Sequence, residues 1–148
     1  MSGELQDLYQ EVILDHNRRP RNFRVIEDGS SAEGFNPLCG DRITVYLKVE
    51  NGTIKDVSFQ GAGCAISKAS ASLMTESVKG KTIEEATALF ERFQRMITGS
   101  ADSSTESLGK LTVLAGVRQF PVRVKCATLA WHTLRSAVGA PGDVVSTE

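Results

Sequence analysis

The chain has 148 residues with 17 basic and 18 acidic side chains, and its formal net charge is −1. A dedicated nucleic-acid-binding protein normally carries a basic excess, so this balance argues against that class. No apolar run approaches the roughly 20 residues needed to span a bilayer. The N-terminal segment carries acidic residues where a signal peptide would be basic. We therefore expect one cytoplasmic domain over residues 1–148, without nucleic-acid or membrane partners.

An amphipathic helix is predicted over residues 4–17, and Pro20 ends it. Its apolar face consists of Leu5, Leu8, Tyr9, Val12 and Ile13. Residues 18–24 then hold four arginines and no acid: Arg18, Arg19, Arg21 and Arg24. This stretch is either a solvated basic linker or a docking patch for an acidic partner surface.

A half-buried strand is predicted by apolar residues that alternate with polar ones: Ile43, Val45, Leu47 and Val49. Asn51-Gly52 is a strong signal for a two-residue hairpin turn. Residues 53–60 then form the returning strand, with Val57 and Phe59 pointing inward. Because a two-stranded ribbon is marginal alone, we expect a third strand within residues 29–34.

Helical spacing resumes after Cys64, and Gly80 suits the end of that helix. Thr82 and Glu85 have the spacing of a capping box for the next helix. The apolar stripe of that helix consists of Ile83, Ala86, Leu89, Phe90, Phe93, Met96 and Ile97. The last helix opens at Pro121, which suits a first-turn position, and runs to about residue 138.

Three stretches carry weaker signals. Residues 99–110 are small and polar and predict a loop, followed by a short helix over residues 111–116. We expect residues 140–148 to form a disordered tail. The order of elements predicts an α+β fold, in which a small antiparallel sheet of about three strands is covered by helices.

The three cysteines, Cys39, Cys64 and Cys126, are an odd number and a poor disulfide framework. In a reducing cytosol they are thiols. Each lies at the boundary of a predicted element, and a helix N-terminus stabilises thiolate. Three thiolates suit zinc, and a tetrahedral zinc site needs a fourth ligand. Three buried structural cysteines remain the open alternative.

Asp41 is the best-placed candidate for the fourth ligand. It lies two residues from Cys39, so in an extended segment both side chains point to the same side. His132 is six residues beyond Cys126, which turns it about 240° around the helix and away from that cysteine. His16 ends the first helix, and we interpret it as a capping or hydrogen-bonding residue.

Four segments together resemble the U-type family of iron–sulfur cluster assembly, which contains IscU and the NifU N-terminal domain. They are LYQEVILDHNRRPRNF, NPLCGDRITVYL, FQGAGCAISKASASLMTESVKGK and FPVRVKCATLAW, and they cover nearly the whole chain. Scaffold members have a histidine before the third cysteine, where this chain has Lys125, and a proline-rich chaperone-binding motif that residues 120–124 lack. These departures, and an insertion at roughly residues 99–119, make the chain most similar to the SufU branch.

The resemblance implies a SufE/NifU-like fold and one zinc ion held by Cys39, Asp41, Cys64 and Cys126. It implies a zinc-dependent sulfurtransferase whose nucleophile, Cys39, accepts persulfide sulfur from a SufS-type cysteine desulfurase. The sulfur then passes to a downstream cluster-assembly complex. Arg123 and Lys125 flank the last cysteine. Arg123 either orients Asp41 or the persulfide during catalysis, or is only surface charge near a helix start.

Two other functions remain open. The chain can be a scaffold on which the same three cysteines assemble a transient [2Fe–2S] cluster. The change from histidine to Lys125 argues against this interpretation. It can also be a structural zinc fold that acts as an adaptor and accelerates no desulfurase.

Overall fold

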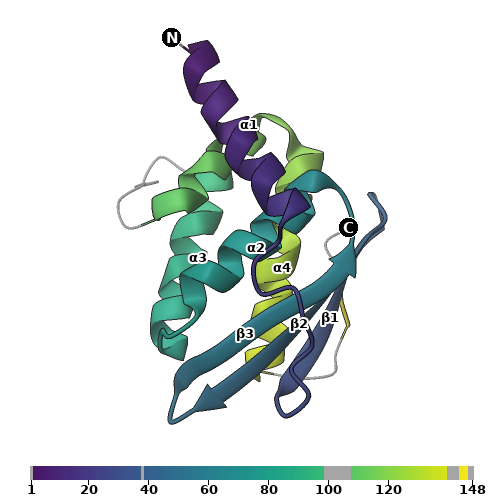
Figure 1. Cartoon of the computed structure of the whole chain (residues 1–148), viewed down its shortest axis with the longest axis vertical. Helices are drawn as coiled ribbons and strands as arrows, with labels where there is room; N and C mark the ends of the chain where they lie inside the picture. Colours follow the sequence, from purple (N-terminus) through teal and green to yellow (C-terminus); the bar gives the residue numbers. More distant parts are fainter. Residues whose placement is uncertain (1, 38, 99–107, 140–143, 147–148) are drawn as a thin grey trace.

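The structure is a computed structural model that describes residues 2–37, 39–98, 108–139 and 144–146. Figure 1 shows the helices gathered on one side of a sheet. In chain order the elements are α1 (Ser2–Arg18), β1 (Ser30–Asn36), β2 (Asp41–Glu50), β3 (Thr53–Ala62), α2 (Ala65–Val78), α3 (Ile83–Thr98), the 3-10 helix η1 (Gly109–Gln119), α4 (Pro121–Gly139) and β4 (Val144–Ser146). Within these described residues, no helix is both long and apolar enough to cross a membrane.

The sheet has the strand order β3-β2-β1-β4. β1 pairs with β2, and β2 with β3, in antiparallel fashion, which confirms the predicted three-stranded core and its third strand. β4 adds a short parallel strand beside β1. The expectation of a disordered tail is therefore wrong for Val144–Ser146, and residues 140–143 and 147–148 lie outside the described part.

The β2–β3 hairpin follows the sequence closely. Asn51 and Gly52 both have positive φ, 53° and 75°, as the predicted two-residue turn requires. The inward residues are almost completely buried: Ile43, Val45, Leu47, Val57 and Phe59. Val49 is 37% exposed, contrary to the prediction. A register shift between Lys48 and Val49 breaks the alternation there.

The helices form as predicted, and they cover the sheet in two layers. α4 packs on β1 and β2, and α2 packs on β3. Farther from the sheet, α1 packs on α2 and α3 packs on α4. The capping box of α3 is present: the N–H of Glu85 donates to Thr82 Oγ1 (3.1 Å), and the N–H of Thr82 donates to Glu85 Oε1 (2.9 Å). The short helix predicted at residues 111–116 is the longer η1, and residues 99–107 lie outside the described part.

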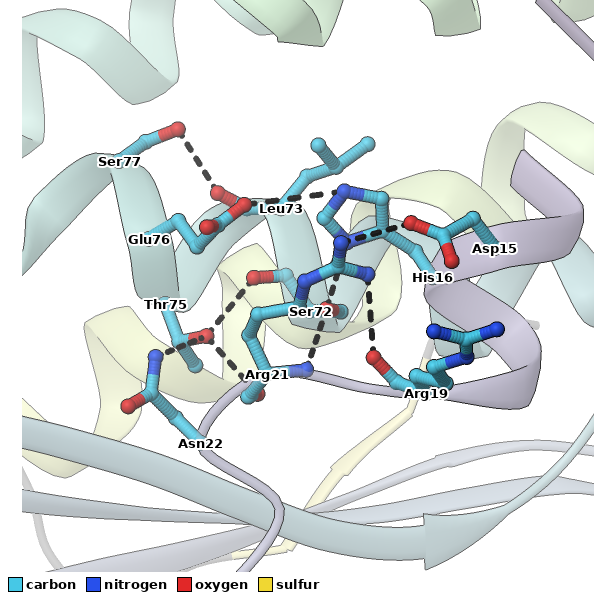
Figure 2. Close-up of polar contacts among 10 residues, drawn as sticks. All are labelled: Asp15, His16, Arg19, Arg21, Asn22, Ser72, Leu73, Thr75, Glu76 and Ser77. Carbon is cyan, nitrogen blue, oxygen red and sulfur yellow. Dashed lines mark hydrogen bonds and ion pairs between the residues drawn. The ribbon is translucent and has the colours of Figure 1, made fainter. Parts of the chain in front are cut away.

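A cluster of polar side chains joins α1 and the segment after it to α2 (Figure 2). Ser72 Oγ lies 2.7 Å from His16 Nδ1 and accepts the backbone N–H of Arg21 at 2.8 Å. Arg21 pairs with Asp15 at 2.6 Å. His16 is therefore a buried hydrogen-bonding residue, as predicted, and α2 is held in place above the sheet.

Two of the four arginines in residues 18–24 are paired inside the chain. Arg21 pairs with Asp15, and Arg24 pairs with Asp56 at 2.6 Å. Asp15 and Asp56 therefore neutralise part of the positive charge of residues 18–24, for which the stretch itself contains no acid.

Candidate metal centre

Cys39 and Asp41 lie at the connection between β1 and β2. Asn36 and Asp41 face each other where the two strands meet. The N–H of Gly40 donates to the carbonyl of Asn36 (2.9 Å), and Gly40 has φ +72°, a conformation that favours glycine. This tight turn places half-buried Cys39 next to Asp41, which is completely buried.

Cys64 follows β3, whose last residues pair with the first residues of β2, so it lies close to Asp41. It is the N-cap of α2, and its sulfur accepts the N–H of Ser67 at 3.4 Å. Its own N–H donates to Asp41 Oδ1 at 2.7 Å. A Cβ at Gly63 would lie 2.5 Å from that same oxygen, so the glycine lets the chain approach the carboxylate closely.

Cys126 completes the arrangement from the second turn of α4. Its Sγ lies 3.2 Å from Cys39 Sγ, well beyond the roughly 2.05 Å of a disulfide bond. Asn36 Nδ2 donates to the same sulfur at 3.5 Å. The pKa of the Cys126 thiol is raised, first by burial and then by hydrogen bonds with Cys39 and Asp41.

The structure thus brings together three of the four predicted ligands. One ligand atom each from Cys39, Asp41 and Cys126 lies within 4.8 Å of the others. Cys64 is not in this group, but its Sγ lies 3.8 Å from Asp41 Oδ2. We call these four residues the thiol cluster. A buried carboxylate beside thiols is the donor set expected for zinc, so the residues present fit that metal.

Both histidines lie outside the thiol cluster. His132 packs edge-on against Phe90, with ring centroids 5.1 Å apart, and burial lowers its pKa. His16 contacts Ser72 instead. Neither contact is with a residue of the thiol cluster, and the choice of Asp41 over a histidine as the fourth ligand stays a prediction.

Arg123 lies beside the thiols although its side chain is exposed. Its pKa is raised, first by the charge of the Cys64 thiolate and then by a side-chain hydrogen bond with Cys126. A cation held there favours anionic sulfur, whereas the predicted orientation of Asp41 by Arg123 stays a prediction. Lys125 is half-buried.

Sequence reasoning missed two residues of this site. Asn36 donates to Cys126, and Gly63 makes room for the Asp41 carboxylate. The only signal for either was its place next to a segment already singled out, Asn36 before Pro37-Leu38-Cys39 and Gly63 directly before Cys64.

Comparison with known proteins identifies the family of the chain. A family model described as the NifU-like N terminal domain matches residues 8–127. The zinc-dependent sulfurtransferase SufU of Bacillus subtilis is 42% identical over 137 residues, which is 93% of each chain. The iron–sulfur cluster assembly scaffold protein IscU of Streptococcus pyogenes is 42% identical over 136 residues, covering 92% of this chain and 86% of that one.

A solved structure has the same fold. It is that of a putative iron–sulfur cluster assembly scaffold protein for the SUF system from Fervidobacterium islandicum. Its sequence is 36% identical, the TM-score is 0.82, and the match covers 86% of this chain and 94% of that one.

Proposed function

This chain belongs to the family of NifU-like N-terminal domains, and we propose that it is a zinc-dependent sulfurtransferase of iron–sulfur cluster assembly. In this proposal it accepts persulfide sulfur from a SufS-type cysteine desulfurase. The observation that carries it is the contact of half-buried Cys39 with buried Cys126, at 3.2 Å, beside the buried carboxylate of Asp41. The similarity to the Bacillus subtilis sulfurtransferase over 93% of both chains supports the same activity.

The four residues of the thiol cluster would hold the zinc ion. When bound, zinc supplies a positive charge that keeps thiols ionised near neutral pH. The chain itself supplies the positions. The β1–β2 turn holds Cys39 and Asp41, the N-cap of α2 holds Cys64, and the second turn of α4 holds Cys126.

Cys39 is the residue we assign as sulfur acceptor, because it lies on the turn between β1 and β2 and is partly exposed, whereas Cys126 is buried. Cys64 is partly exposed too, but its sulfur caps α2 by accepting the N–H of Ser67. The Cys39 thiolate attacks the outer sulfur of the donor's persulfide. A bond forms between Cys39 Sγ and that sulfur, and the bond from that sulfur to the donor cysteine breaks. The donor cysteine leaves with the electron pair as a thiolate, and Arg123 lies where its cation favours the anionic persulfide formed.

A scaffold for a [2Fe–2S] cluster is the second candidate. The similar proteins of Streptococcus pyogenes and Fervidobacterium islandicum are both named as scaffolds, and three clustered cysteines suit such a cluster. The two functions differ in what they require of the desulfurase: a sulfurtransferase accelerates its turnover, and a passive scaffold does not.

The test is alanine release by a SufS-type desulfurase in the presence of the zinc-loaded protein, the metal-stripped protein, and a zinc-loaded Cys39→Ser variant. We expect strong acceleration by the zinc-loaded wild type alone. Mass spectrometry should find one additional sulfur atom on the peptide that contains Cys39. Zinc content and circular dichroism of the variant serve as controls for its fold.

Two results would overturn the proposal. One is full sulfur acceptance by Cys39→Ser with zinc still bound. The other is the absence of acceleration in every form, which favours the scaffold, and anaerobic reconstitution with iron and sulfide then tests that function.

A further inference from the structure

Positive charge is concentrated in the C-terminal part of the chain. Residues 108–139 contain five basic side chains and no Asp or Glu, although the whole chain has a net charge of −1. The basic residues are Lys110, Arg118, Arg123, Lys125 and Arg135. Between 108 and 139, Arg118, Arg123 and Lys125 form no ion pair with a carboxylate of any residue that the structure describes. The charges of Arg118 and Lys125 are available to a partner, whereas Arg123 already interacts with the thiols of Cys64 and Cys126.

Among the residues whose exposure the structure describes, the two most exposed large apolar side chains lie in the same segment. Phe120 is 59% exposed and Val122 is 49% exposed, at the start of α4. Val122 precedes Cys126 by four residues, so the two share one face of the helix and are one turn apart. The carbonyl of Phe120 accepts the N–H groups of Arg123 (2.8 Å) and Val124 (3.1 Å), which holds its backbone in place.

We propose that Arg118, Phe120 and Val122, which we call the α4 entrance, form the docking surface for the protein that donates persulfide sulfur. The inference rests on the proposed function, because that function requires a protein donor to reach Cys39. Cys39 Sγ lies 3.2 Å from Cys126 Sγ, and Val122 lies one helical turn from Cys126. A donor that delivers sulfur to Cys39 therefore contacts the α4 entrance.

The charge at this surface determines what the donor must present. An aromatic and a branched apolar residue beside unpaired cations are typical of an interface core with arginine at its margin. The matching surface carries an apolar contact with acidic residues around it. A second copy of this chain would bring like charges together, so it is the less suitable occupant.

Residues 18–24, which the sequence offered as another candidate docking patch, differ from this surface in how their charges are paired. Arg21 and Arg24 pair with Asp15 and Asp56, so acids of the same chain already offset their charge. In residues 118–125, by contrast, no basic side chain pairs with an Asp or Glu of the described part of the chain.

The experiment measures the desulfurase rate against the concentration of the zinc-loaded protein. We expect Phe120→Ser to raise the half-saturating concentration about tenfold, and Val122→Ser about threefold, with the maximal rate unchanged. Arg118→Ser should raise it less and weaken its dependence on salt concentration, because a charge at the margin acts mainly on association.

Matched controls are available elsewhere on the surface. Val25 is 46% exposed and lies beside Arg24 rather than α4, so Val25→Ser should leave the half-saturating concentration unchanged. Arg19→Ser removes the same charge as Arg118→Ser and should not change the salt dependence. Saturation of Phe120→Ser and Val122→Ser at the wild-type concentration would overturn the proposal.

A small-molecule persulfide separates failure of docking from failure of the proposed function. Cysteine persulfide needs no docking surface, so all three variants should transfer its sulfur to Cys39 as the wild type does. If the wild type accepts sulfur from neither donor, the proposed function itself fails. If a variant loses transfer from the small molecule as well, the substitution has damaged the thiol cluster, and the α4 entrance is not a separate docking surface.

Discussion

Two groups of polar side chains, each built around buried residues, differ in how completely their hydrogen-bonding groups are satisfied. In the His16 cluster of Figure 2, which also contains Asp15, Arg21, Ser72 and Glu76, the partners come from the protein itself. Ser72 Oγ contacts both His16 Nδ1 and the N–H of Arg21, and His16 Nε2 lies 3.7 Å from Glu76 Oε1. Such a network specifies how α1 and α2 pack, and it has no need of a ligand.

The thiol cluster has weaker partners. The carboxylate of Asp41 is completely buried and accepts the backbone N–H of Cys64, and its Oδ2 lies 3.8 Å from the Cys64 sulfur. Thiols are weak donors, and an ionised carboxylate is costly to bury without a cation. The comparison teaches that burial alone does not identify a binding site. The informative feature is a set of clustered metal-ligating side chains, three thiols and one carboxylate, whose hydrogen bonds within the protein are few and weak.

The largest expected effect is that of zinc on the thiol cluster. At a concentration 1,000-fold above its dissociation constant, a ligand that binds only the folded state stabilises it by about 4 kcal/mol. For a domain of this size that raises the melting temperature by about 10 °C. Thermal unfolding followed by circular dichroism, without zinc and with zinc in excess over the protein, measures the shift.

The Cys126→Ser variant is the control for that shift. It removes a buried sulfur that we propose as a zinc ligand, with little change in volume, so it should lose most of the zinc effect. An equal zinc-induced shift in wild type and Cys126→Ser would show that zinc binds elsewhere.

Ser72→Ala should lower the free energy of unfolding of the protein by about 2–4 kcal/mol, because it disrupts the His16 cluster. The substitution removes the partner of both His16 Nδ1 and the N–H of Arg21, and each buried group left unsatisfied costs about 1–3 kcal/mol. Urea unfolding measures the change. The zinc-induced shift in melting temperature should remain, because Ser72 is not part of the thiol cluster.

Ser77→Ala is the matched control on the same helix. The hydroxyl of Ser77 donates only to the carbonyl of Leu73, one turn back, a bond that adds little stability. We expect a change of under about 1 kcal/mol. Equal losses for Ser72→Ala and Ser77→Ala would contradict the special role of the His16 cluster.

The fold was predictable where the signals are local. The Asn51-Gly52 turn and the Thr82–Glu85 capping box depend on neighbouring residues, and both form as expected. Val144–Ser146 become a strand only through pairing with distant β1, which no short-range pattern indicates. Val49 is exposed because of a register shift that an alternating pattern cannot contain.

The site was predictable in composition and less so in detail. The residue types Cys39, Asp41 and Cys126 indicated a metal centre, and the packing of α4 on the sheet brings them together. The hydrogen bond from Asn36 to Cys126 and the approach of Gly63 to Asp41 exist only in three dimensions. Their residue types carry no chemistry of their own, so sequence reasoning had no ground on which to select them.

The smallest expected effect is the pH dependence that His16 gives to stability. Its pKa is lowered, first by burial and then by the charge of Arg21, with Glu76 and Asp15 acting in the opposite direction and Lys110 adding to the lowering. In the unfolded chain a histidine has a pKa of about 6.5. Above that pH both states are neutral and stability is complete. As the pH falls below 6.5, the unfolded state takes up a proton first, so stability declines until the folded-state pKa is reached.

Urea unfolding between pH 7.5 and 5.5 measures this decline, with the zinc-free Cys126→Ser variant as background so that the protonation of metal ligands does not contribute. The pKa of His132 is also lowered by burial, so it contributes in the same direction. Adding His132→Gln to this background should reduce the pH dependence of the free energy of unfolding, and the remainder is due to His16. Adding His16→Gln as well should remove that remainder. A ring resonance of His16 that titrates in the folded protein at pH 6.5 or above would contradict the prediction, because a fully satisfied cluster that holds a neutral imidazole must resist its protonation.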